Sequence, residues 1–256
     1  MIFDFNNTPI HYNVVGEGPT IVLLHGFLES SKMWDSLVPT LSKNRKILTI
    51  DLPGLGESGV ISDIHSMELM AEVVDAVLNH LQISSATFVG HSMGGYVTMA
   101  YADLFTNRVE KIVLLNSTPI ADSEEKKDVR DRSIEIINRN ANAYISMAIA
   151  NWAGKESREK FSDEIEESKN LAYTFPIDGI KAALKGMRDR KDRTSVLKSF
   201  SGEKYILLSE DDPLMPVKDN LELAKKCGAK TKVVDGGHLS TIENLPAVKE
   251  FLISIL

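Results

Sequence analysis

Five consecutive residues, Gly90-His91-Ser92-Met93-Gly94, fit the pattern G-x-S-x-G. They follow the apolar run ATFV and open a segment of helical character, MGGYVTMAYA. This pattern between a strand and a helix is typical of a strained turn that lifts a serine hydroxyl clear of a sheet. Glycine at both flanking positions removes the Cβ atoms that would clash with neighbouring backbone. We therefore expect Ser92 to act as a nucleophile at a helix N-terminus, where the dipole favours developing negative charge.

A serine hydroxyl is a weak nucleophile unless a base takes its proton, and the base needs a third group to hold its tautomer. His238 is the candidate base, because it lies in a Gly-Gly loop after the last predicted strand. Asp212, after the run KYILL, is the candidate third group. Asp211 is the alternative acid, since adjacent residues of an extended segment point in opposite directions. Pro216, four residues after Asp212, favours Asp212.

A carbonyl under attack becomes an oxyanion, which two preorganised N–H donors can stabilise. The backbone N–H of Met93, directly after the serine, is one candidate. The backbone N–H of Phe27, in the loop after the run TIVLL, is the other. We expect the side chain of His25 to brace that loop. Asp51 opens the turn-rich segment DLPGLGES, where we expect it to shape the loop, with a catalytic role as the alternative.

The elements that must position these residues alternate along the chain. Apolar runs begin at Thr20, Lys46, Ala86, Lys111, Lys204 and Lys230. Most are continuously apolar at their centres, which is typical of parallel strands buried on both faces. Helical patterns lie between them, at 66–81, 92–105, 217–227 and 242–256. The sequence therefore predicts an α/β fold with a mostly parallel central sheet and helices on both faces. The first fifteen residues, with Asn6-Asn7 as a turn, predict an antiparallel hairpin at the sheet edge.

One stretch, residues 121–200, contains no convincing strand. It carries 31 charged residues among its 80, compared with 34 among the other 176. Because a bare loop of that length is uncommon in a compact domain, we expect an inserted helical cap of about four helices. The predicted organisation is a first core part at 1–120, a helical cap or lid at 121–200 and a second core part at 201–256.

Composition excludes several classes of function. The formal net charge of −7 gives no reason to expect nucleic acid as a partner. The single cysteine, Cys227, forms no internal disulfide, and the histidines lack metal-ligand spacing, so we expect neither a metal nor another cofactor. The N-terminus shows no signal peptide, and no apolar run approaches a membrane span. A cytoplasmic protein with no membrane partner is the expectation, and the oligomeric state is left open.

In combination, the motifs resemble those of the α/β-hydrolase superfamily. HGF, DLPGLGES, GHSMGG, DDPLMP and GGH occur in the order found in its cap-bearing esterase, enol-lactonase and C–C hydrolase branch. The resemblance covers 1–120 and 201–256 and implies a Ser-His-Asp catalytic triad of Ser92, His238 and Asp212. Epoxide hydrolases and haloalkane dehalogenases of this superfamily carry aspartate at the turn, whereas this chain has Ser92. This difference favours acyl transfer to serine over alkyl transfer to a carboxylate.

The expected function is hydrolysis of a carboxylic ester, or a related small-molecule acyl compound, through an acyl-enzyme. Enol-lactone hydrolysis, C–C bond hydrolysis and a lyase reaction on the same residues are alternatives. A ligand-binding or signalling protein on a hydrolase scaffold is the non-enzymatic alternative. Arg188, Arg190 and Arg193 are candidates for binding a substrate carboxylate, with a solvated surface position as the alternative. Candidate pocket walls in the cap are Tyr144, Met147, Trp152, Phe161, Tyr173, Phe175 and Met187.

Overall fold

Eight strands form one sheet in the computed structural model, which describes all 256 residues. The strands are β1 (Ile2–Phe5), β2 (Thr8–Val15), β3 (Thr20–Leu24), β4 (Lys46–Ile50), β5 (Ala86–His91), β6 (Val109–Leu115), β7 (Glu203–Ser209) and β8 (Lys230–Val234). Their order across the sheet is β1-β2-β4-β3-β5-β6-β7-β8. The strands from β3 to β8 pair in parallel, and β2 pairs antiparallel with both β1 and β4. The predicted α/β architecture is thereby confirmed.

The antiparallel hairpin at the N-terminus is also confirmed. β1 pairs with β2 from Ile2 opposite His11 to Phe5 opposite Thr8. Asn6 and Asn7 make the turn with φ angles of 53° and 64°. Asparagine adopts this left-handed region more readily than most residues, and two such residues in succession suit a tight hairpin.

Alternate residues of the central strands point to opposite faces of the sheet and enter two different cores. On β5, Phe88 belongs to the larger core and Val89 to the smaller one. Helices packed on the larger core are α2 (Met67–His80), α3 (Met93–Leu104) and α9 (Val217–Cys227). Elements packed on the smaller core are the 3-10 helix η1 (Ser31–Trp34), α1 (Val38–Leu41) and α11 (Leu245–Ile255). Burial on both faces explains the continuously apolar strands.

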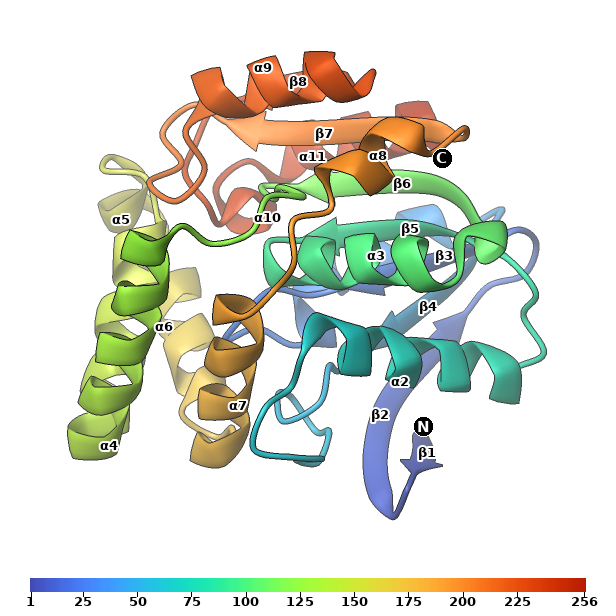
Figure 1. The fold of residues 1–256 in the computed structure, drawn as a ribbon. Coiled ribbons are helices and arrows are strands. Elements are labelled where there is room, and N and C mark those ends of the chain that lie inside the picture. The colour runs from blue at the N-terminus through green and yellow to red at the C-terminus, as the bar shows by residue number, and fades with distance from the viewer.

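Five helices occupy the stretch between β6 and β7. They are α4 (Glu124–Trp152), α5 (Ser157–Lys160), α6 (Ser162–Ala172), α7 (Ile177–Arg188) and α8 (Thr194–Ser199). α4 packs on α6 and α7, whereas α8 packs on α3 and α9 beside the sheet. Figure 1 shows α4 to α7, here called the inserted helices, standing beyond the end of the sheet to which β7 points. That is the carboxyl end of the parallel strands, where α/β proteins place their ligands.

The inserted helix α7 lies directly against the loop between β4 and α2. A Cβ atom built on Gly179 would lie 2.2 Å from the carbonyl oxygen of Gly54, and one on Gly186 would lie 1.7 Å from that of His65. The backbone N–H of His65 also donates to the carbonyl oxygen of Ala182, at 3.0 Å. Glycine on α7 therefore permits a contact of backbone against backbone.

Two local features differ from the prediction. The expected helix at 242–256 is two helices, α10 (Ser240–Glu243) and α11, because Asn244 is non-helical, with φ −146° and ψ 51°. Its side chain caps α11, and Pro246 suits the first turn of a new helix better than the interior of an old one. η1 and α1 were not predicted, because four residues are too few to show a helical period.

Candidate active site

Ser92 occupies a sharp turn between β5 and α3. Its φ of 49° and ψ of −114° lie in a region that residues other than glycine rarely adopt. A Cβ atom on Gly90 would lie 2.3 Å from the carbonyl oxygen of Gly94, and one on Gly94 would lie 2.2 Å from that of Leu24. The two glycines thus allow β5, α3 and β3 to approach closely enough to hold the strained turn.

The structure brings Ser92, His238 and Asp212 together in one hydrogen-bonded chain. Oγ of Ser92 lies 2.8 Å from Nε2 of His238. Nδ1 of His238 lies 2.8 Å from Oδ2 of Asp212. With the proton on Nδ1 donated to the carboxylate, Nε2 is free to accept the serine proton. His238 and Asp212 are both buried. The geometry is that of a nucleophile, a base and an orienting acid.

Four hydrogen bonds hold the carboxylate of Asp212. Oδ2 accepts from Nδ2 of Asn116, at 2.8 Å, as well as from His238. Oδ1 accepts from the backbone N–H groups of Leu214 and Met215, at 2.8 and 3.1 Å. Burial alone would raise the pKa of Asp212, but the attraction of His238 and these hydrogen bonds hold it below its ordinary value. Asp212 is therefore an ionised carboxylate with a fixed orientation.

Asp211, the alternative acid, is exposed and does not contact the imidazole. Its backbone N–H donates to the carbonyl oxygen of Gly236, which joins the loop after β7 to the loop that carries His238.

Asn116 was not predicted as part of the site. Its place directly after β6, at the same edge of the sheet as Ser92 and Asp212, is the signal that could have indicated it.

The backbone N–H groups of Phe27 and Met93 donate to no acceptor within the protein. Met93 is the first residue of α3, so its N–H has no partner in the helix. The loop of Phe27 lies beside the turn, since a Cβ atom on Gly26 would be 3.2 Å from Cβ of Ser92. Both N–H groups are therefore available to a ligand oxygen.

A pair made by the partly buried Glu29 and the buried His91 joins three segments around Ser92. Nδ1 of His91 donates to Oε2 of Glu29, at 2.8 Å, and Nε2 donates to the carbonyl oxygen of His238, at 2.9 Å. The same Glu29 oxygen accepts from the backbone N–H of Gly26, at 2.7 Å. Burial would lower the pKa of His91, but the attraction of Glu29 and both hydrogen bonds raise it above its ordinary value. Burial would raise the pKa of Glu29, but the attraction of His91 and the hydrogen bonds with His91 and Gly26 help to hold it below its ordinary value. Both shifts favour the charged forms of Glu29 and His91.

His25 and Asp51 shape loops, in agreement with the interpretation of the sequence. Nδ1 of His25 donates to the carbonyl oxygen of Gly26, and Nε2 accepts from the backbone N–H of Leu52. The Asp51 carboxylate accepts from the backbone N–H groups of Ser31 and Glu57. Neither side chain is hydrogen-bonded to Ser92 or His238.

Among the candidate pocket walls, Trp152 at the end of α4 contacts the site. The centroid of its indole lies 6.1 Å from that of the His238 ring and 6.2 Å from that of the Phe27 ring. Tyr144, Phe175 and Met187 are buried in the larger core. Met147 is exposed, and Phe161 and Tyr173 are partly buried beside that core.

The three candidate arginines are all paired with carboxylates. Arg188 contacts Asp131 and Asp189. Arg190 pairs with Asp122 and lies over the ring of Tyr96, and Arg193 pairs with Glu68 and Asp103. Arg190 and Arg193 are buried, which corrects the alternative of a solvated position for these two. Their charges are already balanced, so they give no support to a carboxylate-bearing substrate.

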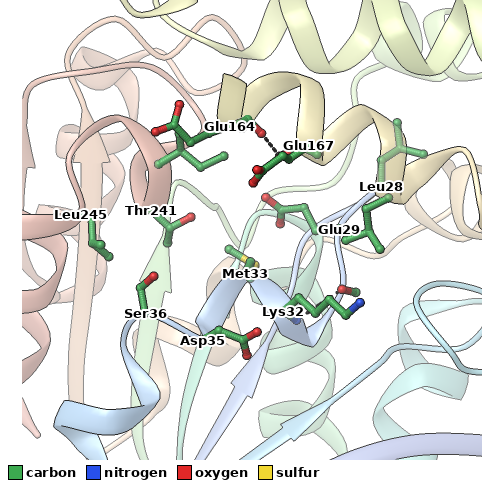
Figure 2. A pocket seen from close by; sticks show the side chains of 14 residues that line it. Leu28, Glu29, Lys32, Met33, Asp35, Ser36, Glu164, Glu167, Thr241 and Leu245 are labelled. Atoms are coloured by element: carbon green, nitrogen blue, oxygen red, sulfur yellow. Dashed lines mark hydrogen bonds between the residues drawn. The ribbon is translucent and has the colours of Figure 1, made fainter. Parts of the chain in front are cut away.

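A cavity of about 550 Å³ lies between α6 and the segment from β3 to η1. Figure 2 shows Glu164 and Glu167 on α6 above Glu29 and Met33. Ser92 and His238 do not line this cavity, but Leu28, next to Phe27, does.

No group of three or more His, Cys, Asp or Glu side chains is arranged to hold a metal ion. No helix combines the length and apolar character that a membrane crossing requires.

Known proteins resemble this chain over nearly its whole length. "Putative carbamate hydrolase RutD" of Yersinia enterocolitica is 26% identical over 259 residues, which cover 96% of this chain and 92% of that protein. A thermophilic esterase from Thermogutta terrifontis is 27% identical with a TM-score of 0.91, over 96% of this chain and 92% of the esterase. The enol-lactonase from Burkholderia xenovorans LB400 shares the fold, with 22% identity and a TM-score of 0.91, over 99% of this chain and 98% of that enzyme.

The family model described as alpha/beta hydrolase fold matches residues 19–245, which include Ser92, Asp212 and His238. This match confirms the resemblance seen in the sequence motifs. The chain belongs to the alpha/beta hydrolase family.

Proposed function

We propose that this protein is a serine hydrolase that cleaves a carboxylic ester through a covalent acyl-enzyme. The observation that carries the proposal is the continuous chain from Ser92 through His238 to Asp212, with both contacts at 2.8 Å. The esterase from Thermogutta terrifontis, similar over most of both chains, supports the choice of an ester. The inserted helices would serve as a cap over the substrate.

In the proposed reaction, Oγ of Ser92 attacks the carbonyl carbon while its proton passes to Nε2 of His238. The oxyanion accepts hydrogen bonds from the N–H groups of Phe27 and Met93. His238 then gives its proton to the departing alkoxide, which leaves as an alcohol. A water molecule attacks the acyl-enzyme with His238 as base, and the acid product leaves with Ser92 restored. Asp212 stabilises the imidazolium in both halves and keeps its own proton state unchanged.

The test is mass spectrometry after brief exposure to an activated ester or a small organophosphate. We expect one adduct, mapped to Ser92, and a burst of alcohol release followed by turnover of the ester. Ser92→Ala should abolish the adduct and reduce kcat by about 10⁴–10⁶. Turnover near the wild-type rate in Ser92→Ala would refute the proposal. A burst without turnover would favour the ligand-binding alternative.

The same preparation should be assayed on acyl esters of several chain lengths, lactones, carbamates and a diketone. Carbamates belong in the panel because the name of the Yersinia relative mentions them. We expect kcat/KM to be highest for an ester. A higher value for a lactone, a carbamate or C–C cleavage would replace the ester while leaving the role of Ser92 intact.

A further inference from the structure

Glu243 is a buried carboxylate that accepts three hydrogen bonds from backbone N–H groups and pairs with no cationic side chain. Its Oε2 accepts from Gly237, at 2.7 Å, and from Gly154, at 2.9 Å. Its Oε1 accepts from Leu239, at 3.0 Å. Burying a charge is costly unless such donors compensate for lost water, so the arrangement ties these three amides to one point.

The three amides belong to two segments that are far apart in the sequence. Gly237 and Leu239 flank His238, whereas Gly154 follows the end of the inserted helix α4. The backbone N–H of His238 itself donates to the carbonyl oxygen of Trp152, the last residue of α4, at 2.9 Å. The backbone N–H of every residue from 237 to 239 therefore donates a hydrogen bond either to Glu243 or to the end of α4.

The two segments also meet without intervening side chains. A Cβ atom on Gly237 would lie 2.2 Å from the backbone nitrogen of Gly154 and 2.9 Å from the carbonyl oxygen of Trp152. A Cβ atom on Gly154 would lie 3.1 Å from Oε2 of Glu243. With backbone packed on backbone, a shift of the end of α4 must be transmitted to the loop that carries His238.

We propose that Glu243 is a positioning residue that ties the end of α4 to the His238 loop, so that the inserted helices set the distance between His238 and Ser92. The inference rests on the proposed function, in which His238 is the base. A carboxylate is required because three N–H donors converge on its two oxygens. The side-chain NH₂ group of a glutamine would face at least one of these backbone N–H donors. Two donors would then point at each other, and the buried backbone N–H would lose its acceptor.

The first test is Glu243→Gln, which keeps the size of the side chain and removes its charge. Two measurements report on His238 without substrate turnover. One is the proton resonance of Nδ1–H, which is hydrogen-bonded to Asp212, and the other is the rate at which a small organophosphate labels Ser92. We expect the resonance to shift or broaden and the labelling rate to fall about 10-fold. Glu250→Gln, the same change at an exposed position of α11, should alter neither.

Gly154→Ala perturbs the same contact from the side of the inserted helices. Its methyl group forces the neighbouring atoms apart by a few tenths of an ångström. We expect a smaller loss, about threefold in labelling rate, with a change of the His238 resonance in the same direction. This variant also decides the matter if Glu243→Gln does not fold.

Wild-type resonance and labelling rate in both folded variants would overturn the proposal. A change in Glu243→Gln with none in Gly154→Ala would overturn the coupling to α4. These results are distinct from failure of the proposed function, because the resonance is measured on the resting protein and does not require Ser92 to turn over substrate.

Discussion

Asn116 extends the hydrogen-bonded chain of the site one residue beyond Asp212. Its φ of 46° is left-handed, and its amide nitrogen donates to both Oδ2 of Asp212 and Oγ of Ser209. Asp212 shares that same Oδ2 between Asn116 and His238. Loss of the amide would remove one of the four hydrogen bonds that hold the carboxylate and would raise the pKa of Asp212, because a bond to the charged form is lost.

Asn116→Gly should therefore lower kcat about 10-fold with little change in KM. Glycine is the suitable replacement, because it tolerates the left-handed φ that alanine does not. Ser209→Ala serves as the control, since it removes the other partner of the amide and leaves the bond to Asp212 in place. Steady-state kinetics on one ester would measure both. Equal losses in the two variants would contradict a role through Asp212.

Ser92, Asp212 and His238 were predictable because each lies in a short motif that follows a recognisable strand. Their mutual contacts follow from the parallel sheet, which gathers strand ends at one edge. The pairing of Glu29 with His91 was not predictable, since 62 positions separate the two residues and no local pattern joins them. The same holds for Glu243, whose partners at 154 and 237 meet only in the folded chain.

At the scale of elements, the six strands from β3 to β8 begin within two residues of the predicted positions, because continuous apolar runs bounded by polar residues mark buried strands sharply. The predicted insertion contains five helices where about four were expected. α8 is short and packs on α3 and α9. The place where α7 docks was not predictable, because it depends on two glycines fitting against a distant loop.

The loop between β4 and α2, against which α7 packs, contains a titratable group, His65. Its Nε2 accepts from the backbone N–H groups of Ile61 and Ser62. Burial lowers its pKa from 6.5 to about 4, although the nearby backbone of Pro53 opposes this shift. The unfolded chain binds this proton below pH 6.5, whereas the folded chain does not until about pH 4. Acid therefore favours the unfolded state across that range.

We expect His65 to lower the free energy of unfolding by about 3 kcal/mol between pH 7 and pH 4. His65→Gln keeps an acceptor but cannot take up the proton, so its stability should fall less over the same range. Urea denaturation at pH 7, 5.5 and 4.5 would measure the difference. The exposed His80 provides the control as His80→Gln. Parallel pH curves for the wild type and His65→Gln would show that His65 does not control acid sensitivity.

At the scale of the whole molecule, burial is distributed unevenly between the sheet and the inserted helices. β3 and β5 are buried at every residue. In α4, by contrast, the buried residues all lie from Ile137 onward, and α5 has none. α7 contrasts with both, because seven of its residues are buried. An isolated helix is marginally stable in water, so a helix with little buried surface depends on few contacts.

Native-state hydrogen exchange should therefore divide the backbone amides into three classes by their exchange rates. We expect amides of β3, β5 and β6 to exchange only through global unfolding, since they lie between both cores. α7 and the end of α4 near Trp152 should exchange more slowly than the first half of α4 and α5, because they are held against the core and the His238 loop. Mass spectrometry of peptides after timed exchange would resolve these segments. Uniform protection of all four inserted helices, equal to that of β5, would instead show that the insertion and the sheet unfold as one cooperative unit.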